Sequence, residues 1–392
     1  MKVKYSNIIM WLLIISPIID NINGYLLLTE NNTSISAIYK TITFFICVFI
    51  LIKIIPTRKE IGRKILVLFF FTIQIGIFGL NDIGGCIYNV SALIKLLMPM
   101  IIIMTMIKLN YYDNTIVRCV EKICNSYCWF FPVSLIVPML FDIGFDTYRS
   151  GFGNKGFYYA GNEISAIMVI ILTMEIEKYK TDKTKLNFIN IILGVAGTIC
   201  IGTKASYIAL AILLLVGLSS EQNINKKLLS ICLLIPSVFG GLWYITNHVN
   251  SIVQNINAIR WRYLMASGIV NFLLSGREVT ARRVFRQVYD EDVLWKLILG
   301  IGPYVAENGA DHILIEMDLF DLLVQFGGIV TVIVILFYAQ YLKKALYSKK
   351  TIYIVGIILL YGISVFSGHV ILAPMVGVVL AVLLLKIEFN EK

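Results

Sequence analysis

Residues 187–219, NFINIILGVAGTICIGTKASYIALAILLLVGLS, decide the fold. Two apolar runs, at about 187–202 and 205–219, are separated only by a short turn that contains Thr203 and Lys204. Each run is about long enough to cross a ~30 Å hydrocarbon core as a helix. The stretch therefore predicts a hairpin of two transmembrane helices whose tip is Gly202–Thr203–Lys204.

The rest of the chain repeats this pattern. Hydrophobic residues make up 58% of the 392 residues, charged residues only 15%, and the mean hydropathy is +0.82. This composition indicates an all-α polytopic membrane protein, because outer-membrane strands would instead show alternation over about 10 residues. The net charge of +10 lies mostly in short loops between apolar runs, which indicates membrane topology and not a nucleic-acid partner.

Charge placement predicts about twelve spans with both termini in the cytoplasm. The spans are expected at about 8–28, 35–55, 65–80, 87–107, 126–145, 162–177, 187–202, 205–219, 228–246, 319–342, 351–366 and 370–386. Residues 108–124 are half amphipathic and are expected to lie at the inner interface. Roughly 22 Lys and Arg residues then fall inside and about 10 outside, as the positive-inside rule requires.

This topology divides the chain into three parts. Residues 1–246 hold the first nine predicted spans and a short outer loop, 146–161. Residues 247–318 form a large extracytoplasmic loop with interfacial helices, between spans nine and ten. Residues 319–392 hold the last three spans.

The large loop is rich in arginine and then turns acidic. Its arginines are Arg260, Arg262, Arg277, Arg282, Arg283 and Arg286. Arg282, Arg283 and Arg286 share a helical stripe, for which contact with lipid headgroups is the preferred interpretation. Arg277 instead stands on the tight turn Ser275–Gly276–Arg277, where its guanidinium could clamp a diphosphate bidentately.

The acidic segment leads into the tenth predicted span. On a helix, Asp311, Asp318 and Asp321 would share one face, and His312 and Glu316 another. Acids that enter a membrane must face a watery cavity or pair with cations. The segment is therefore a candidate site, and ion pairing with the loop's own arginines is the alternative.

Two further outer turns carry cations. Residues 148–156, YRSGFGNKG, place Arg149 and Lys155 among glycines and aromatic rings, and Lys204 opens a helix at the hairpin tip. Glycines allow close backbone approach, and the N–H groups at a helix start favour an anion. The alternatives are an ordinary interfacial loop for Arg149 and a snorkelling side chain for Lys204.

Cysteines give no sign of a metal site. The only cluster, Cys119, Cys124 and Cys128, has no histidine near it in the sequence. Small membrane-buried thiols are the better interpretation. We expect no metal ion and no cofactor.

Taken in order, these motifs resemble the Wzy-type O-antigen and capsular polysaccharide polymerases, and more distantly the O-antigen ligases. The matching elements are residues 149–152 with Asn162, the tip 202–206, the turn Ser275–Gly276–Arg277, the turn 299–302, and a histidine-containing segment that ends at Phe326–Gly327–Gly328. Each motif is short, and their order and sidedness carry the resemblance.

The resemblance implies a GT-C-like membrane glycosyltransferase of the bacterial cytoplasmic membrane. Such an enzyme transfers a growing glycan from undecaprenyl diphosphate to a new lipid-linked repeat unit. It implies that Arg149, Lys204 and Arg277 bind the diphosphate, although the family usually has arginine where this chain has Lys204. It maps the family histidine onto His312, and a flippase and a chain-length regulator become expected partners.

The mechanism that follows is a metal-independent, inverting displacement on the outer face. The acceptor hydroxyl needs a base, for which His312, Asp311 and Glu316 are candidates, and positioned arginines stabilise the leaving diphosphate. An O-antigen ligase-type transferase and a lipid-linked oligosaccharide flippase are the alternatives. A flippase would line its path with charges inside the spans, where only Lys40, Lys95 and Asp20 lie deep.

Overall fold

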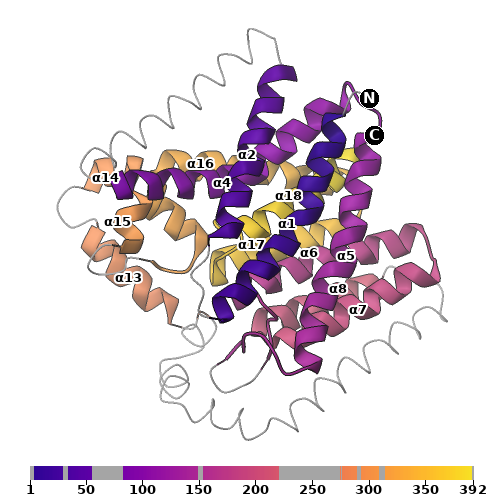
Figure 1. The fold of residues 1–392 in the computed structure, drawn as a ribbon. Coiled ribbons are helices and arrows are strands. Elements are labelled where there is room, and N and C mark those ends of the chain that lie inside the picture. Colours follow the sequence, from indigo (N-terminus) through magenta and orange to yellow (C-terminus); the bar gives the residue numbers. More distant parts are fainter. Residues whose placement is uncertain are drawn as a thin grey trace, which may run out of the picture.

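The computed structural model describes residues 4–29, 34–54, 83–148, 153–219, 274, 276–288, 293–308 and 314–390. Within these ranges the protein is almost entirely helical, and the only β feature is one isolated bridge between Asp146 and Asn154. Figure 1 shows a bundle of long helices with a group of short ones at its side. Their bounds are α1 Tyr5–Leu28, α2 Ile35–Ile54, α4 Ile83–Asn110, α5 Ile116–Leu140, α6 Gly161–Thr181, α7 Lys185–Ile201, α8 Lys204–Ser219, α13 Arg277–Val288, α14 Val293–Leu299, α15 Pro303–Asn308, α16 Asp318–Tyr347, α17 Thr351–Ser367 and α18 Pro374–Asn390.

These helices coincide closely with most of the predicted spans. In the described part of the chain, five helices are long and apolar enough to cross a membrane: α1, α2, residues 84–110 of α4, α5 and α16. The shorter apolar helices are 185–201, 205–217 and 351–367. The predicted spans at 65–80 and 228–246 lie outside the described residues. A polytopic helical membrane protein is therefore confirmed, whereas the count of twelve spans remains a prediction.

One prediction about helix boundaries was wrong. Residues 108–124 were expected to lie at the interface before a separate span at 126–145, but α4 runs to Asn110 and α5 is continuous from Ile116 to Leu140. The half-amphipathic pattern has another cause, because the first turns of α5 bury Ile116, Cys119, Val120 and Ile123 against the bundle. The three clustered cysteines are buried free thiols, as predicted.

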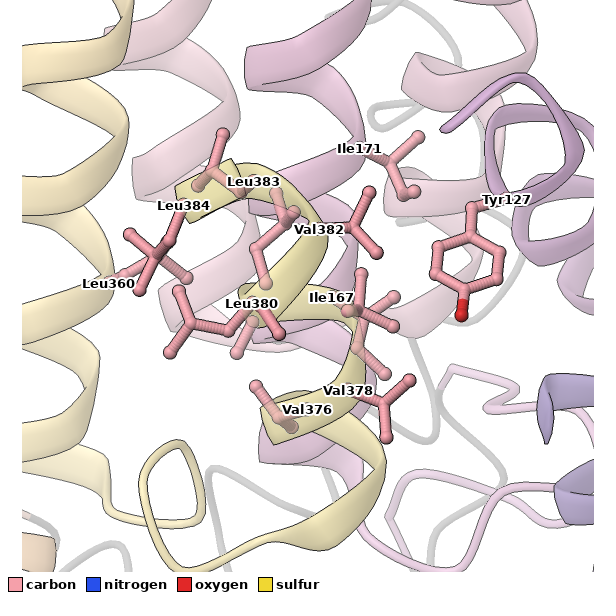
Figure 2. Packing of buried hydrophobic residues seen from close by; sticks show 14 of the residues in the cluster. Tyr127, Ile167, Ile171, Leu360, Val376, Val378, Leu380, Val382, Leu383 and Leu384 are labelled. Atoms are coloured by element: carbon pink, nitrogen blue, oxygen red, sulfur yellow. The ribbon is translucent and has the colours of Figure 1, made fainter. Parts of the chain in front are cut away.

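Two central helices, α6 and α18, form the core of the bundle. Residues 164–177 of α6 are all buried, and residues 375–385 of α18 are buried on every face. A helix that is apolar all round belongs inside a bundle. Figure 2 shows side chains of α18 among Ile167 and Ile171 of α6, Tyr127 of α5 and Leu360 of α17.

Small residues let the helices approach closely, as is common in membranes. A Cβ atom added to Gly197 of α7 would lie 3.0 Å from the Cα of Pro132 in α5, and one added to Gly356 of α17 would lie 2.6 Å from the Cγ2 of Thr173 in α6. Thr173 is fully buried and cannot give way.

Replacement of Gly356 by leucine is therefore expected to destabilise the protein by about 1–3 kcal/mol, the usual cost of overpacking. Thermal unfolding of the detergent-solubilised protein measures the loss. Gly362→Leu on the same helix is the matched control, because a Cβ there meets no atom within 4 Å in the described structure. Equal losses in the two variants would contradict the packing argument.

Gly327 interrupts the helical geometry of α16, and the turn between α14 and α15 packs against this break. Gly327 has φ 78° inside α16, and the backbone N–H groups of Ile301 and Gly302 donate to Val324 O at 2.8 Å and Gln325 O at 3.0 Å. The carbonyl groups that the break would leave unpaired are satisfied in this way. Two of the sequence motifs, residues 299–302 and Phe326–Gly327–Gly328, thus lie against each other.

The two ends of the bundle differ. One end carries ion pairs that tie the helices together: Lys4–Asp113, Lys344–Glu388, Lys350–Glu177 and Lys386–Glu121. Hydrogen bonds from Ser6 and Thr115 lower the pKa of Asp113 to about 2, which keeps it ionised. Most of these lysines are ones that the sequence places in the cytoplasm. The opposite end, formed by residues 141–148, 153–161, 201–204, 314–318 and 367–374, is called the site end below.

Candidate functional site

At the site end, the loop that follows α5 lies against the tip of the α7–α8 hairpin. The Thr147 hydroxyl donates to Ile201 O at 2.6 Å, and the Asn154 N–H donates to Cys200 O at 2.8 Å. Gly202 has φ 76°, the left-handed conformation that lets α7 end and α8 begin two residues later. Thr147 and Asn154, which flank the segment that carries Arg149, therefore lie beside the tip that leads into Lys204.

The loop is held in shape by its own hydrogen bonds. Asn154 is buried; its Nδ2 donates to Ile143 O at 2.9 Å, and its Oδ1 accepts from the Gly156 N–H at 2.7 Å. Lys155 stands over the rings of Phe145 and Tyr159, with 5.8 Å from Nζ to each ring centroid. Burial lowers the pKa of Lys155, and Asp146 opposes this shift. Lys155 therefore helps to hold the loop together through its contacts with these two rings.

The first turn of α6 links the hairpin tip to the C-terminal helices. Ser165 Oγ lies 2.7 Å from Thr203 Oγ1, and Asn162 Nδ2 donates to Ser367 O at 3.0 Å. Asn162, which the sequence motif singled out, therefore positions the turn between α17 and α18.

Asp318, the first residue of α16, organises that turn. It accepts four hydrogen bonds: from Ser364 Oγ at 2.7 Å and from the backbone N–H groups of His369, Val370 and Ile371 at 2.7, 2.8 and 2.8 Å. The residue is 2% exposed. Charge-assisted hydrogen bonds of this kind offset the cost of burying a carboxylate at the end of a span.

Arg277 and Glu316 meet beside this turn. The Arg277 Nη2 donates to Glu316 Oε2 at 3.0 Å. Glu316 has φ 61°, an unusual value for a residue with a side chain, and a Cβ on Gly368 would lie 2.5 Å from its carbonyl oxygen. A tight backbone contact thus fixes the acid that holds Arg277. Strained backbone of this kind is concentrated at functional sites.

The helical position predicted for Glu316 was wrong, and the positions predicted for Asp311 and His312 lie outside the described residues. The helix begins at Asp318, so Glu316 lies outside it, and Asp321 points back to accept from the N–H groups of Ile315 at 2.8 Å and Met317 at 3.0 Å. Asp318 and Asp321 therefore serve the backbone. Glu316 forms the ion pair with a loop arginine that the sequence left as the alternative.

Of the predicted site residues, the structure brings Arg277 and Glu316 together. Arg149, Asp311 and His312 lie outside the described residues, and Lys204 is placed only by the backbone at the start of α8. The roles given to these residues remain predictions.

The stripe of arginines on α13 is a helix face, as predicted. The opposite face buries Val284 and Val288 against Ile315, Met317 and Val324. A cavity of about 460 Å³ lies between α13 and α16, with mostly apolar walls; it is lined by Leu274, Glu278, Ala281, Arg282, Phe285, Arg286, Met317 and Phe320. Its charged lining residues are Glu278, Arg282 and Arg286.

Sequence reasoning gave no role to four charged residues that lie within apolar helices: Asp20 of α1, Lys40 of α2, Lys95 of α4 and Glu163 of α6. Lys40 Nζ lies 2.5 Å from Asp20 Oδ1, and Ser36 Oγ also donates to Asp20. The available signal was charge inside apolar runs, which marks functional residues in membrane proteins.

No group of three or more His, Cys, Asp and Glu side chains suited to a metal ion occurs in the described ranges.

Comparison with known families adds to this picture. A family model described as "O-antigen ligase like membrane protein" matches residues 2–221 and 247–390, which is most of the chain. The chain belongs to this family. Membership supports a glycan-processing role in the membrane, of glycosyltransferase type. Neither the curated proteins nor the solved structures contain a match.

Proposed function

We propose that this O-antigen ligase-like protein is a glycan polymerase. It would transfer a growing oligosaccharide from undecaprenyl diphosphate onto a new lipid-linked repeat unit, at the outer face of the cytoplasmic membrane. The new glycosidic bond forms as the bond between the donor sugar and its diphosphate breaks, with inversion at the sugar carbon. The product would be an O-antigen, a capsule or another surface polysaccharide.

The burial and hydrogen bonding of the Arg277 side chain are the observation that supports this proposal. Its side chain is only 16% exposed, Glu316 takes one donor, and its Nε is buried without an acceptor in the described structure. A guanidinium with spare donors, fixed by an acid, is prepared to bind an oxyanion. A departing diphosphate presents such oxyanions, so the positioned cation would stabilise it without a metal ion.

The neighbouring turns support a shared site for the diphosphate. Thr147 and Asn154, on either side of the segment that carries Arg149, contact the hairpin tip that leads into Lys204. Asn162, Ser367 and Gly368 connect this region to the Arg277–Glu316 pair. Arg149 and Lys204 would then complete the anion site that Arg277 begins. His312 and Asp311 remain candidates for the base, whereas Glu316 is engaged by Arg277.

Deletion of the gene separates this function from its alternatives. We expect the mutant to carry surface glycan of a single repeat unit, because flipping and final transfer still proceed. Gel electrophoresis of the extracted glycan measures chain length, and re-expression of the wild-type protein is the control.

Three other results would contradict the polymerase. Full-length glycan still attached to undecaprenyl diphosphate would indicate a ligase. Repeat units trapped on the cytoplasmic side would indicate a flippase. Unchanged surface glycan would exclude all three activities.

A further inference from the structure

Glu278, the second residue of α13, carries a buried carboxylate that binds nothing in the described structure. Both of its side-chain oxygens are buried without a hydrogen-bond partner there. Arg282 follows one helical turn later, at the spacing at which glutamate and arginine usually pair, yet the Glu278 oxygens accept no hydrogen bond from it. Buried acceptors are normally satisfied, so an unpaired carboxylate indicates a missing partner.

The carboxylate belongs to the cavity between α13 and α16. Glu278 is one of the residues that line this space of about 460 Å³, and among the described lining residues it alone has side-chain oxygen atoms. Small-molecule sites have volumes of roughly 300–1,000 Å³. Calcium and magnesium ions require several oxygen ligands, so a single carboxylate in this cavity suits a hydroxyl or an ammonium group instead.

The other lining residues favour a hydroxyl group over an ammonium group. Two arginines, Arg282 and Arg286, share the cavity with Glu278 and would repel a cationic ligand. The rings of Phe285 and Phe320 meet edge to face, with their centroids 5.8 Å apart. Such rings can pack against the C–H face of a sugar while a carboxylate accepts from its hydroxyl groups. A neutral sugar therefore fits this lining better than a cation.

The cavity adjoins the ion pair between Arg277 and Glu316. Arg277 directly precedes Glu278, and Glu316 directly precedes Met317, which also lines the cavity. Consecutive Cα atoms lie only about 3.8 Å apart. The Arg277 Nε is buried and has no acceptor among the described residues. The start of α13 thus offers unpaired donors for an oxyanion beside unpaired acceptors for hydroxyl groups.

We propose that this cavity binds the donor sugar that is bonded directly to the diphosphate, and that Glu278 accepts hydrogen bonds from its hydroxyl groups. The inference rests on the proposed glycosyl transfer and adds a residue that selects the donor. In a glycosyl diphosphate a single oxygen atom joins the sugar to the phosphate. A phosphate held by Arg277 therefore places that ring, and no other sugar of the glycan, beside Glu278.

The test measures binding of two lipids to the full-length protein in phosphatidylcholine liposomes. One lipid is undecaprenyl diphosphate, and the other is the lipid-linked repeat unit extracted from cells that lack the gene. Glu278→Gln should weaken binding of the lipid-linked repeat unit about 10- to 100-fold, the usual contribution of a hydrogen bond to a charged group. Binding of undecaprenyl diphosphate, which has no sugar, should stay unchanged. Arg283→Ala, an exposed residue of α13 that does not line the cavity, is the matched control and should bind both lipids normally.

Thermal unfolding separates ligand binding from a structural role of Glu278. Because its carboxylate has no partner in the described part of the protein, Glu278→Gln should unfold at the wild-type temperature or above it. A lower unfolding temperature would mean that the protein itself holds the carboxylate, and would overturn the inference. Ala281→Leu fills part of the same cavity and should also weaken binding of the lipid-linked repeat unit alone.

Arg277→Ala distinguishes failure of the sugar site from failure of the proposed function. We expect this variant to bind both lipids weakly, because it lacks the diphosphate contact. Normal binding of the lipid-linked repeat unit by Glu278→Gln, with weak binding of both lipids by Arg277→Ala, would overturn the sugar site alone. Equal weakening of both lipids in Glu278→Gln would also overturn it. Normal binding of both lipids by Arg277→Ala would overturn the diphosphate site on which the inference rests.

Discussion

Arg277→Ala is expected to lower the rate of glycan polymerisation about 100- to 1000-fold, the typical effect of removing one preorganised donor from a transition-state charge. In the structure Arg277 is mostly buried, holds Glu316 at 3.0 Å and keeps its Nε unpaired. Its loss would remove a cation from the leaving diphosphate and leave Glu316 without its partner. Polymer length in cells and release of undecaprenyl diphosphate in liposomes measure the effect.

Two variants make this prediction specific. Arg277→Lys keeps the charge but loses the planar fork, so we expect only partial recovery of the rate. Arg283→Ala, an exposed arginine on the same helix, is the matched control and should polymerise normally. Full-length polymer from Arg277→Ala, or an equal loss in Arg283→Ala, would contradict a specific diphosphate contact.

The helices were largely predictable because apolar runs are bounded by charges and glycines. Helix α2 was expected at 35–55 and lies at Ile35–Ile54, and the hairpin tip falls at Gly202 as expected. The start of helix α5 was not predicted. A helix end that buries cysteines and isoleucines against the bundle has the same half-amphipathic pattern as a helix that lies on a membrane surface. Local periodicity does not say which surface a face will meet.

The candidate site was less predictable because it depends on long-range contacts. The acids around residue 318 were expected to face a watery cavity or to pair with cations, but Asp318 binds backbone N–H groups some fifty residues away, at His369, Val370 and Ile371. No sequence pattern gives such a pairing. Conversely, Asp20 and Lys40 were noticed as charges inside spans, but only the fold shows that they form a pair.

That pair leads to the second large effect, which concerns stability. Lys40 Nζ lies 2.5 Å from Asp20 Oδ1, and each side chain is 7% exposed. Removal of one partner from a buried ion pair leaves an uncompensated charge and typically costs about 3–5 kcal/mol. We therefore expect Asp20→Asn and Lys40→Met each to lower the thermal stability of the detergent-solubilised protein strongly.

The double variant should recover most of the loss. Buried ion pairs replaced as a unit by groups of similar volume are often neutral, because the desolvation penalty disappears together with the attraction. Asp20→Leu with Lys40→Met should therefore unfold near the wild-type temperature. A full double-mutant cycle measures the coupling free energy. Additive losses would mean that the two residues act independently and that the contact between α1 and α2 does not depend on this pair.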